Sequence, residues 1–306
     1  MNNLIDVENL KTFLKHHGLK PRDYLGQNFL VDQAALQGIV AAAELQPGDV
    51  VLEVGPGLGV LTFELVKRAG RVIAVEKDSK LAELLRRNPE FNSGSRRKDP
   101  ESIPDRSPGQ GSGLQKNKVF NLDILKFNLS EHITGDYKVV ANIPYYLTSK
   151  LLQTFLEMAN KPTSMVLMVQ KEVGERVTAS AGELSILGIS VQIYADAEIV
   201  LSVPKESFWP QPEVDSVVLK ITPRDKYPEI KDKKTFFRIV KIAFAGKRKQ
   251  IHNTLANGLK MNKEQTWQLL KQAGIEPTTR PQDLKIEQWV ELYKRVAYSG
   301  QRSENN

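Results

Sequence analysis

The sequence contains no cysteine among its 306 residues and has only four histidines. The first absence excludes disulfides, thiolate nucleophiles and thiolate metal ligands. His16, His17, His132 and His252 lack the spacing of metal ligands, so we expect no metal centre. No apolar run reaches membrane-spanning length, and the N-terminus has neither a basic n-region nor a long apolar h-region. We therefore expect a soluble, cytoplasmic protein without a membrane partner.

Basic residues are concentrated in the last quarter of the chain. The formal net charge is +7, with an isoelectric point near 9.3. From Arg224 onward there are 18 Lys and Arg against 9 Asp and Glu, whereas residues 1–223 carry 25 against 27. This asymmetry favours a module that faces a polyanion, joined to a nearly neutral catalytic module. A solvated surface that happens to be basic is the alternative.

A strand, a glycine-rich loop, a helix and a second strand follow one another between residues 50 and 76. Residues 50–54 (Val-Val-Leu-Glu-Val) are apolar except for Glu53, as expected of a buried parallel strand. The segment 55–59 (Gly-Pro-Gly-Leu-Gly) follows, then a predicted helix over 61–69 and a strand over 71–76 that ends in Glu76. Such a unit binds nucleotides, because the glycines allow close approach and the acid accepts hydrogen bonds from a ribose diol.

The spacing of these residues favours one class of ligand over another. A dinucleotide site has three glycines spaced G-x-G-x-x-G, with the pyrophosphate at the helix N-terminus. Here the pattern is Glu53-x-Gly55-x-Gly57-x-Gly59. Glu53 would repel a pyrophosphate but would suit the amino group or sulfonium of S-adenosylmethionine. We therefore predict an S-adenosylmethionine-dependent methyltransferase, with a dinucleotide enzyme as the less favoured alternative.

The stretch 139–146 (Val-Val-Ala-Asn-Ile-Pro-Tyr-Tyr) is a predicted strand with a polar and aromatic tip. Asn142 offers a side-chain carbonyl, Pro144 offers a backbone carbonyl without an N–H, and Tyr145 adds a flat ring. An exocyclic amine on a nucleobase needs such acceptors, and an unstacked base needs an aromatic face. We predict that Asn142 and Pro144 hold such an exocyclic amine and that Tyr145 stacks on the base. A strand followed by a simple proline turn is the alternative reading.

The remaining segments predict the domain organisation. Residues 88–118 are rich in Ser, Gly, Pro and charge, which predicts a flexible insertion in a methyltransferase domain over 1–223. Strands are predicted over 191–201 and 214–221. Further on, an apolar helical stripe (Phe237, Val240, Phe244, Ile251 and Leu255) predicts a basic helical RNA-binding domain over 224–298, followed by a frayed tail over 299–306.

These motifs together resemble one family, the ribosomal RNA adenine N6,N6-dimethyltransferases of the small subunit. The resemblance runs from about residue 20 to residue 296. It is carried by residues 26–30 (Gly-Gln-Asn-Phe-Leu), Glu53-x-Gly-x-Gly-x-Gly59, Glu76, Asp123, Asn142-Ile-Pro-Tyr145, Phe208-x-Pro-x-Pro212 with Val214-Asp-Ser216, and residues 244–249 (Phe-Ala-Gly-Lys-Arg-Lys) with Asn253.

The resemblance implies a fold, a cofactor and a substrate. The fold is α/β: a Rossmann-like methyltransferase sheet with a small all-helical C-terminal domain. The substrate would be two adjacent adenines in a hairpin loop near the 3′ end of 16S-type RNA in the small ribosomal subunit, each dimethylated during subunit biogenesis by an enzyme we expect to be monomeric. Site residues would be Asn28, Leu30, Glu53, Gly55, Gly57, Glu76, Asp123 and Asn142 for S-adenosylmethionine, Asn142, Pro144 and Tyr145 for catalysis, Phe208 for the base pocket, and Lys247, Arg248 and Lys249 for RNA.

Two other functions remain open at this stage. Related enzymes that methylate a large-subunit adenine and confer macrolide resistance share most of these motifs, but usually lack a segment like 244–255. A non-catalytic assembly factor is the other alternative, although the intact acidic residues argue against it. Leu122 also stands where the family usually has glycine, and the segment 178–183 is shorter than its usual counterpart.

Overall fold

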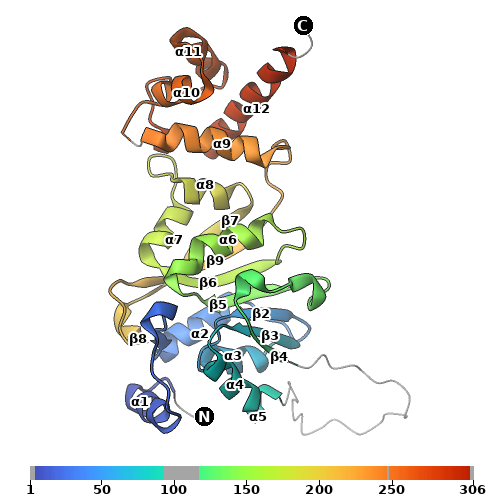
Figure 1. The fold of residues 1–306 in the computed structure, drawn as a ribbon, viewed down its shortest axis with the longest axis vertical. Helices are drawn as coiled ribbons and strands as arrows, with labels where there is room; N and C mark the ends of the chain where they lie inside the picture. The colour runs from blue at the N-terminus through green and yellow to red at the C-terminus, as the bar shows by residue number, and fades with distance from the viewer. Residues whose placement is uncertain (1–3, 93–116, 247, 304–306) are drawn as a thin grey trace, which may run out of the picture. The chain divides into compact units, whose positions relative to one another are not determined.

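The computed structural model describes residues 4–92, 117–246 and 248–303 (Figure 1). The chain divides into two compact units, Met1–Lys171 with Glu198–Thr222, and Glu172–Ala197 with Pro223–Asn306. Compared with the predicted division at residue 223, the structure thus also groups residues 172–197 with the C-terminal segment. The physical reason is a pair of backbone hydrogen bonds, because the carbonyl of Gln282 accepts from the N–H groups of Gly182 and Leu184.

The first unit is built on a mixed seven-stranded sheet. Its order is β4-β3-β2-β5-β6-β9-β7. Strands β2 to β6 are parallel to their neighbours, whereas β9 runs antiparallel to β6. The strands are β1 (Phe29–Leu30), β2 (Val50–Val54), β3 (Arg71–Glu76), β4 (Lys118–Asn121), β5 (Lys138–Asn142), β6 (Ser164–Gln170), β7 (Ala195–Val203), β8 (Phe208–Trp209) and β9 (Ser216–Pro223).

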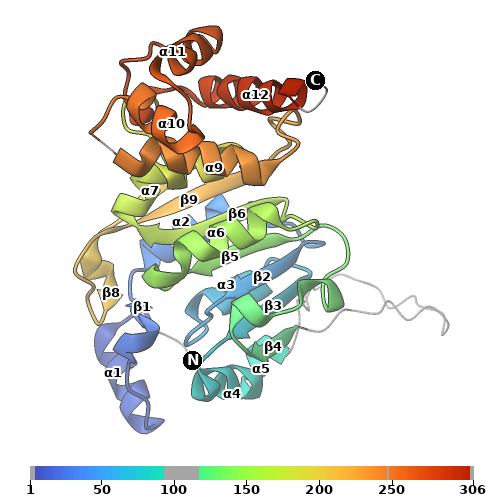
Figure 2. The same ribbon diagram turned by 45° about the horizontal axis from the view of Figure 1, so that its top comes forward.

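Helices cover both faces of this sheet. Parallel crossovers are right-handed, and the chain moves from β2 toward β4 in one direction and from β5 to β6 in the other. Helices α3 and α4 therefore lie on one face and α6 on the opposite face (Figure 2). The helices of the described chain are α1 (Val7–His16), α2 (Gln33–Ala42), α3 (Val60–Val66), α4 (Ser79–Arg87), α5 (Pro89–Asn92), α6 (Thr148–Glu157), α7 (Lys171–Thr178), α8 (Ile186–Gln192), α9 (Lys233–Ala243), α10 (Ile251–Leu259), α11 (Lys263–Gln272) and α12 (Ile286–Ser303).

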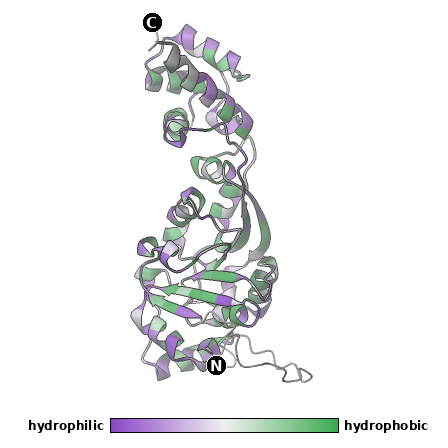
Figure 3. Cartoon of the chain, turned by 90° about the vertical axis from the view of Figure 1, so that its right-hand side faces the viewer, coloured by the Kyte–Doolittle hydropathy of each residue, from purple (hydrophilic) through white to green (hydrophobic). Residues whose placement is uncertain are grey.

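The apolar runs of the sequence become the centre of the sheet. Residues of β2, β3, β5 and β6 are almost completely buried, and the strands stand out as hydrophobic in Figure 3. One large core cluster joins Leu36 and Ile39 of α2, Leu65 of α3 and Val140 of β5. The predicted α/β fold with a helical C-terminal region is confirmed, and the core fixes the ends of β2, β3 and β5 relative to one another.

The predicted insertion at 88–118 is ordered at both of its ends. Asn88 is buried, Pro89–Asn92 form α5, and Lys118 begins β4, while residues 93–116 lie outside the described residues. The side chain of Asn117 accepts a hydrogen bond from the N–H of Val72 and donates one to the carbonyl of Phe91, both at 2.8 Å. This side chain therefore joins the start of β4 to β3 and to the end of α5.

Three local predictions were wrong. Residues 191 and 192 end helix α8, whose N-cap Ser185 accepts from Gly188, so β7 begins only at Ala195. The apolar stripe from 237 to 255 is not one helix, because α9 ends at Ala243 and a 3-10 turn at 244–246 separates it from α10. The tail expected at 299–306 continues α12 as far as Ser303.

Packing of α10 against α9 in the second unit depends on a glycine. A Cβ atom added to Gly258 would lie 2.2 Å from Cγ2 of Ile242. Alanine in a helix normally stabilises by about 1 kcal/mol relative to glycine. Here we expect Gly258→Ala to lower the free energy of unfolding by about 1–2 kcal/mol, because an overpacked core typically costs about 1–3 kcal/mol. Urea unfolding of the full chain measures this.

Two further variants separate the clash from other effects of the substitution. Gly48→Ala serves as the control, because nothing lies within 4 Å of an added Cβ there and the φ angle is not positive. It should change stability by less than about 0.5 kcal/mol. Adding Ile242→Ala to Gly258→Ala should recover part of the loss. A Gly258→Ala variant as stable as the parent would contradict this account of the packing.

Candidate active site

A deep pocket opens in the first unit where the parallel strands end. Its volume is about 270 Å³, far more than one ion or water molecule needs. Ligands in open α/β sheets bind outside the carboxyl ends of the strands, which is where these residues meet. The lining includes Leu25–Leu30, Glu53–Leu58, Val75–Lys77, Leu81, Leu122–Leu125, Asn142–Leu147, Lys150 and Phe208.

Glycines shape the floor of the pocket after β2. Gly55, Gly57 and Gly59 all have positive φ angles, of 68°, 59° and 86°. L-residues with a Cβ rarely adopt this conformation. At Gly59 a Cβ would also lie 2.9 Å from side-chain atoms of Leu85 and Phe63. The glycine spacing in the sequence is therefore required by the backbone of this loop.

Glu76 is placed at the end of β3 beside the glycine loop. Its carboxylate accepts hydrogen bonds from the N–H of Gly57 at 3.0 Å and from the N–H of Asp78 at 2.8 Å. Burial raises the pKa of Glu76, and these backbone donors partly oppose the rise. The two hydrogen bonds fix the carboxylate at the pocket wall, and its predicted contact with a ribose stays a prediction.

Glu53 is the most deeply buried acid of the pocket, with 1% of its surface exposed. Its Oε2 atom has no hydrogen-bond partner among the described residues, and neither has the nearby hydroxyl of Thr62. Burial raises the pKa of Glu53 to about 8; the Thr62 hydroxyl opposes this rise, and the negative charge of Glu76 adds to it. Glu53 is therefore mainly protonated at neutral pH, and a cationic ligand group would supply its missing partner.

Asp123 lies just beyond β4 and is paired with a lysine. Its Oδ2 is 3.0 Å from Nζ of Lys77, and its Oδ1 accepts from the N–H of Leu125 at 3.1 Å. Burial raises the pKa of Asp123, but Lys77 and this amide outweigh it, so the net pKa is lowered. Lys77 was not among the predicted site residues. Its position directly after Glu76, at the end of a parallel strand, could have indicated that it lies at the pocket.

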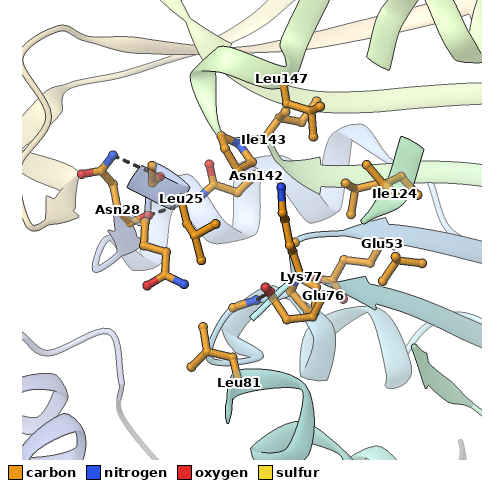
Figure 4. Close-up of a pocket in the computed structure, with 18 of the residues that line it drawn as sticks. Leu25, Asn28, Glu53, Glu76, Lys77, Leu81, Ile124, Asn142, Ile143 and Leu147 are labelled. Carbon is orange, nitrogen blue, oxygen red and sulfur yellow. Dashed lines mark hydrogen bonds between the residues drawn. The ribbon is translucent and has the colours of Figure 1, made fainter. Parts of the chain in front are cut away.

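Asn142 ends β5 and is oriented by the loop that precedes β1. Its Nδ2 donates to the backbone carbonyl of Asn28 at 3.4 Å, which leaves Oδ1 as the acceptor of the same amide. The Nδ2 of Asn28 donates to the carbonyl of Gly26 at 3.5 Å. Figure 4 shows Asn28 and Asn142 on one side of the pocket, with Glu53 and Glu76 on the other. Asn28 thus positions Asn142; its predicted contact with a cofactor stays a prediction.

The residues after Asn142 form a short 3-10 helix, η4 (Tyr145–Leu147). The carbonyl of Pro144 accepts from the N–H of Leu147 at 2.9 Å, so one of its two lone pairs remains for a substrate. The hydroxyl of Tyr145 lies 2.9 Å from Oγ of Ser216, and burial raises the pKa of Tyr145. The ring is thereby held beside the pocket, as a stacking role requires.

Leu30 and Phe208 close the pocket from a two-stranded sheet. Strand β1 pairs antiparallel with β8, with Leu30 opposite Phe208, and both residues are buried. The loop before β1 is held by Asp78, which accepts from Nε2 of Gln27 at 3.2 Å and pairs with Arg22 at 3.2 Å. Phe208 therefore lines the pocket from the short strand β8.

The predicted RNA-binding residues belong to the other unit. Arg248 and Lys249 are exposed and lie between the turn at 244–246 and α10, whereas Lys247 falls outside the described residues. Within residues 4–92, 117–246 and 248–303, no cluster of three metal-binding side chains occurs. In the same part of the chain, no helix has both the length and the apolar character needed to cross a bilayer.

Together these features define a class of protein. A parallel sheet, a positive-φ glycine loop after β2 and a carboxylate at the end of β3 form an α/β domain for a nucleoside cofactor. The buried Glu53 without a partner fits a cationic ligand group better than a pyrophosphate. This is the arrangement expected of an S-adenosylmethionine-dependent methyltransferase.

Comparison with known proteins gives the family. The family model described as "Ribosomal RNA adenine dimethylase" matches residues 18–100 and 107–298. A protein of Dehalococcoides mccartyi strain BAV1, "Ribosomal RNA small subunit methyltransferase A", is 41% identical and covers 92% of this chain and 90% of its own length. A protein of the same name from Lactobacillus acidophilus is 37% identical and covers 94% of this chain and 95% of its own. The chain belongs to the ribosomal RNA adenine dimethylase family, which consists of S-adenosylmethionine-dependent methyltransferases.

Two solved structures are similar over most of the chain. A dimethyladenosine transferase from Plasmodium falciparum has a TM-score of 0.70 and 24% identity, covering 89% of this chain and 98% of that one, and supports the fold. The 23S rRNA methyltransferase ErmE has a TM-score of 0.65 and 28% identity, covering 88% of this chain and all of that one. The predicted family and the predicted class of enzyme are confirmed, and the dinucleotide alternative is wrong.

Proposed function

We propose that this enzyme uses S-adenosylmethionine to dimethylate N6 of two adjacent adenines in a hairpin loop near the 3′ end of small-subunit RNA. The observation that carries the proposal is the acceptor of Asn142, oriented by Asn28 at one side of a pocket whose other side holds Glu53 and Glu76. The names of the relatives that are 37–41% identical favour the small subunit. The enzyme would act in the cytoplasm, as a monomer, during biogenesis of that subunit.

The cofactor site is assigned from the pocket walls. Gly55 and Gly57 allow close approach of the ligand, Glu76 would accept from ribose hydroxyls, and Asp123 would accept from the adenine amine. Leu30 would add an apolar wall. Glu53, buried and unpartnered among the described residues, would face a cationic group. When bound, S-adenosylmethionine supplies a methyl group on a positively charged sulfur.

The substrate adenine would be held by residues 142–145. Its N6 is a poor nucleophile, because the lone pair is delocalised into the ring. If Oδ1 of Asn142 and the carbonyl of Pro144 accept the two N–H groups, the amine is aimed at the methyl group, and positioning and electrostatics provide the rate. The proton leaves to solvent after transfer, so no strong general base is needed. Tyr145 and Phe208 would form the walls of the pocket around the base.

The RNA outside the pocket would be gripped by basic residues of the second unit. Arg248 and Lys249 are exposed, as phosphate contacts must be, and Lys247 completes the same sequence segment. Contacts of this kind position an RNA but carry little sequence information. The choice between ribosomal subunits must therefore be tested directly.

The test is methyl transfer from labelled S-adenosylmethionine to unmethylated small and large ribosomal subunits, with nucleoside analysis of the product. We expect dimethyladenosine in small-subunit RNA. Label confined to large-subunit RNA would overturn the proposal in favour of a second candidate, which the similarity to ErmE supports. Tight binding of the small subunit without any label would instead indicate an assembly factor.

A further inference from the structure

Exposed apolar side chains gather around the mouth of the pocket. Only eight large hydrophobic residues are exposed in the part of the chain that the structure describes. Three of them, Leu122, Leu125 and Tyr146, line the pocket, and Tyr24 lies next to the lining residue Leu25. The most exposed are the two tyrosines, Tyr24 at 74% and Tyr146 at 58%. Such clustering of apolar surface marks a binding site more often than chance.

The two tyrosines belong to one surface although they are 122 positions apart in the sequence. A Cβ atom built on Gly26 would lie 3.8 Å from Cδ1 of Tyr146, so the backbone that carries Tyr24 passes beside the Tyr146 ring. The ammonium of Lys77, which lines the pocket, lies near both tyrosines. The Tyr24 hydroxyl accepts from Nη1 of Arg22 at 3.3 Å.

Tyr146 cannot share the proposed role of Tyr145. Both residues lie in η4, and a 3-10 helix has three residues per turn, so neighbouring side chains diverge by about 120°. Tyr145 is half-buried and held by Ser216, whereas Tyr146 is mostly exposed. Tyr146 therefore presents its ring to a group at the solvent-exposed rim of the pocket.

Charge at the mouth indicates what that group is. Lys150 lines the pocket, is exposed, and forms no ion pair with any of the described residues. Lys77 and Arg22 add further positive charge, although each already has an acidic partner, Asp123 and Asp78 respectively. Aromatic rings beside an unpaired lysine are the combination that binds single-stranded nucleic acid, by stacking on bases and contacting phosphates.

We propose that Tyr24 and Tyr146 form an aromatic lip that stacks on an unpaired nucleotide adjacent to the target adenine, with Lys150 on its phosphate. This inference rests on the proposed function and assigns residues at the rim of the pocket to the same RNA. Stacking on each ring contributes about 1–3 kcal/mol, or roughly 5- to 150-fold in affinity. The lip would hold the neighbouring base in reach while the first is methylated.

The experiment measures binding of RNA hairpins that carry 2-aminopurine next to the target adenine, in the presence of S-adenosylhomocysteine. Hairpins from small-subunit and large-subunit RNA are compared. Tyr24→Ala and Tyr146→Ala should each weaken binding of the hairpin at least fivefold and reduce the fluorescence change of 2-aminopurine. Tyr24→Phe and Tyr146→Phe keep the rings and should bind within about twofold of the parent. Ile199→Ala, another exposed apolar residue of the first unit, is the matched control.

The outcomes distinguish failure of the aromatic lip from failure of the proposed function. If the parent enzyme methylates the small-subunit hairpin but both alanine variants bind it normally, the lip is refuted and the proposed function stands. If the parent binds and methylates only the large-subunit hairpin, the proposed function fails. The affinities of the variants for that hairpin then test the aromatic lip. Loss of affinity in the phenylalanine variants would assign the effect to the hydroxyls and overturn stacking. A parent that binds neither hairpin overturns the lip, whereas the proposed function is then decided by methyl transfer to the assembled subunits.

Discussion

Replacing Asn142 with alanine should lower kcat by about 100- to 1,000-fold while leaving the affinity for S-adenosylmethionine within about threefold. Removal of one preorganised polar group that acts in the transition state has this magnitude in other enzymes. The amide is preorganised here, because Nδ2 donates to the carbonyl of Asn28 and leaves Oδ1 as the acceptor for the proposed contact with N6. Single-turnover methyl transfer and calorimetric cofactor binding measure the two quantities separately.

Asn128→Ala provides the matched control for this substitution. Asn128 is also an asparagine of the first unit, but its side chain bonds to Glu131 at the surface. It should retain full kcat. Near-normal turnover of Asn142→Ala would remove Asn142 from the mechanism, and an equal loss of cofactor affinity would make it a binding residue instead.

The affinity for S-adenosylmethionine should rise about tenfold per pH unit between pH 6 and 7.5, and level off above the pKa of Glu53 near 8. The sign follows from burial. In the empty pocket the pKa of Glu53 is raised to about 8, so the carboxyl is protonated below that pH. A cationic ligand favours the ionised form, so binding must release a proton, and one proton is worth a factor of ten per pH unit. Calorimetry in buffers of different ionisation enthalpy counts the released protons.

Glu53→Gln should bind S-adenosylmethionine at least tenfold more weakly at pH 7.5 and lose most of the pH slope. Glu76 faces the same site and also has a raised pKa, mainly from burial, so Glu76→Gln identifies its share of the slope. The amino group of the ligand titrates equally with every variant. An unchanged slope in Glu53→Gln would show that the released proton comes from another group.

The raised pKa of Glu53 also makes the stability of the folded protein depend on pH. This stability should fall as pH rises, whereas the affinity for S-adenosylmethionine should rise. Because the folded-state pKa of Glu53 is raised, the folded protein retains a proton that the unfolded chain loses between pH 4.5 and about 8. The contribution of Glu53 to stability therefore falls over this window as pH increases. The Gln variant lacks this penalty, so it should gain stability relative to the parent as pH rises.

Much of the site was predictable because its residues belong to short continuous motifs of the sequence. Apolar strands that end in Glu53–Gly55, Glu76 and Asn142 must meet at one edge of a parallel sheet. What could not be predicted depends on contacts between distant segments. The hydrogen bond from Asn142 to Asn28 joins residues 114 positions apart, and nothing local at residue 28 indicates that its backbone carbonyl is the group used.

The segment wrongly predicted as a strand and the unpredicted side chains at the pocket also have physical explanations. The alternation of β-branched and polar residues at 189–193 (Ile-Ser-Val-Gln-Ile) favours a strand, but burial of Ile189 and Val191 in helix α8 overrides this preference. The ion pair of Lys77 with Asp123 and the exposure of Tyr24 depend on three-dimensional packing. The sequence around Tyr24 does not reveal this exposure, because the short 3-10 turn Asp23–Leu25 is too brief to produce a recognisable period.

The hydrogen bonds of Asn117 indicate where the chain can accept an insertion. Its side chain joins β3 and the end of α5 to the start of β4, so the described segments on either side of residues 93–116 are connected to each other directly. The family model matches up to residue 100 and again from residue 107, so its interruption falls in the same segment. We therefore expect that a reporter peptide or affinity tag introduced between residues 100 and 107 leaves methyl transfer intact.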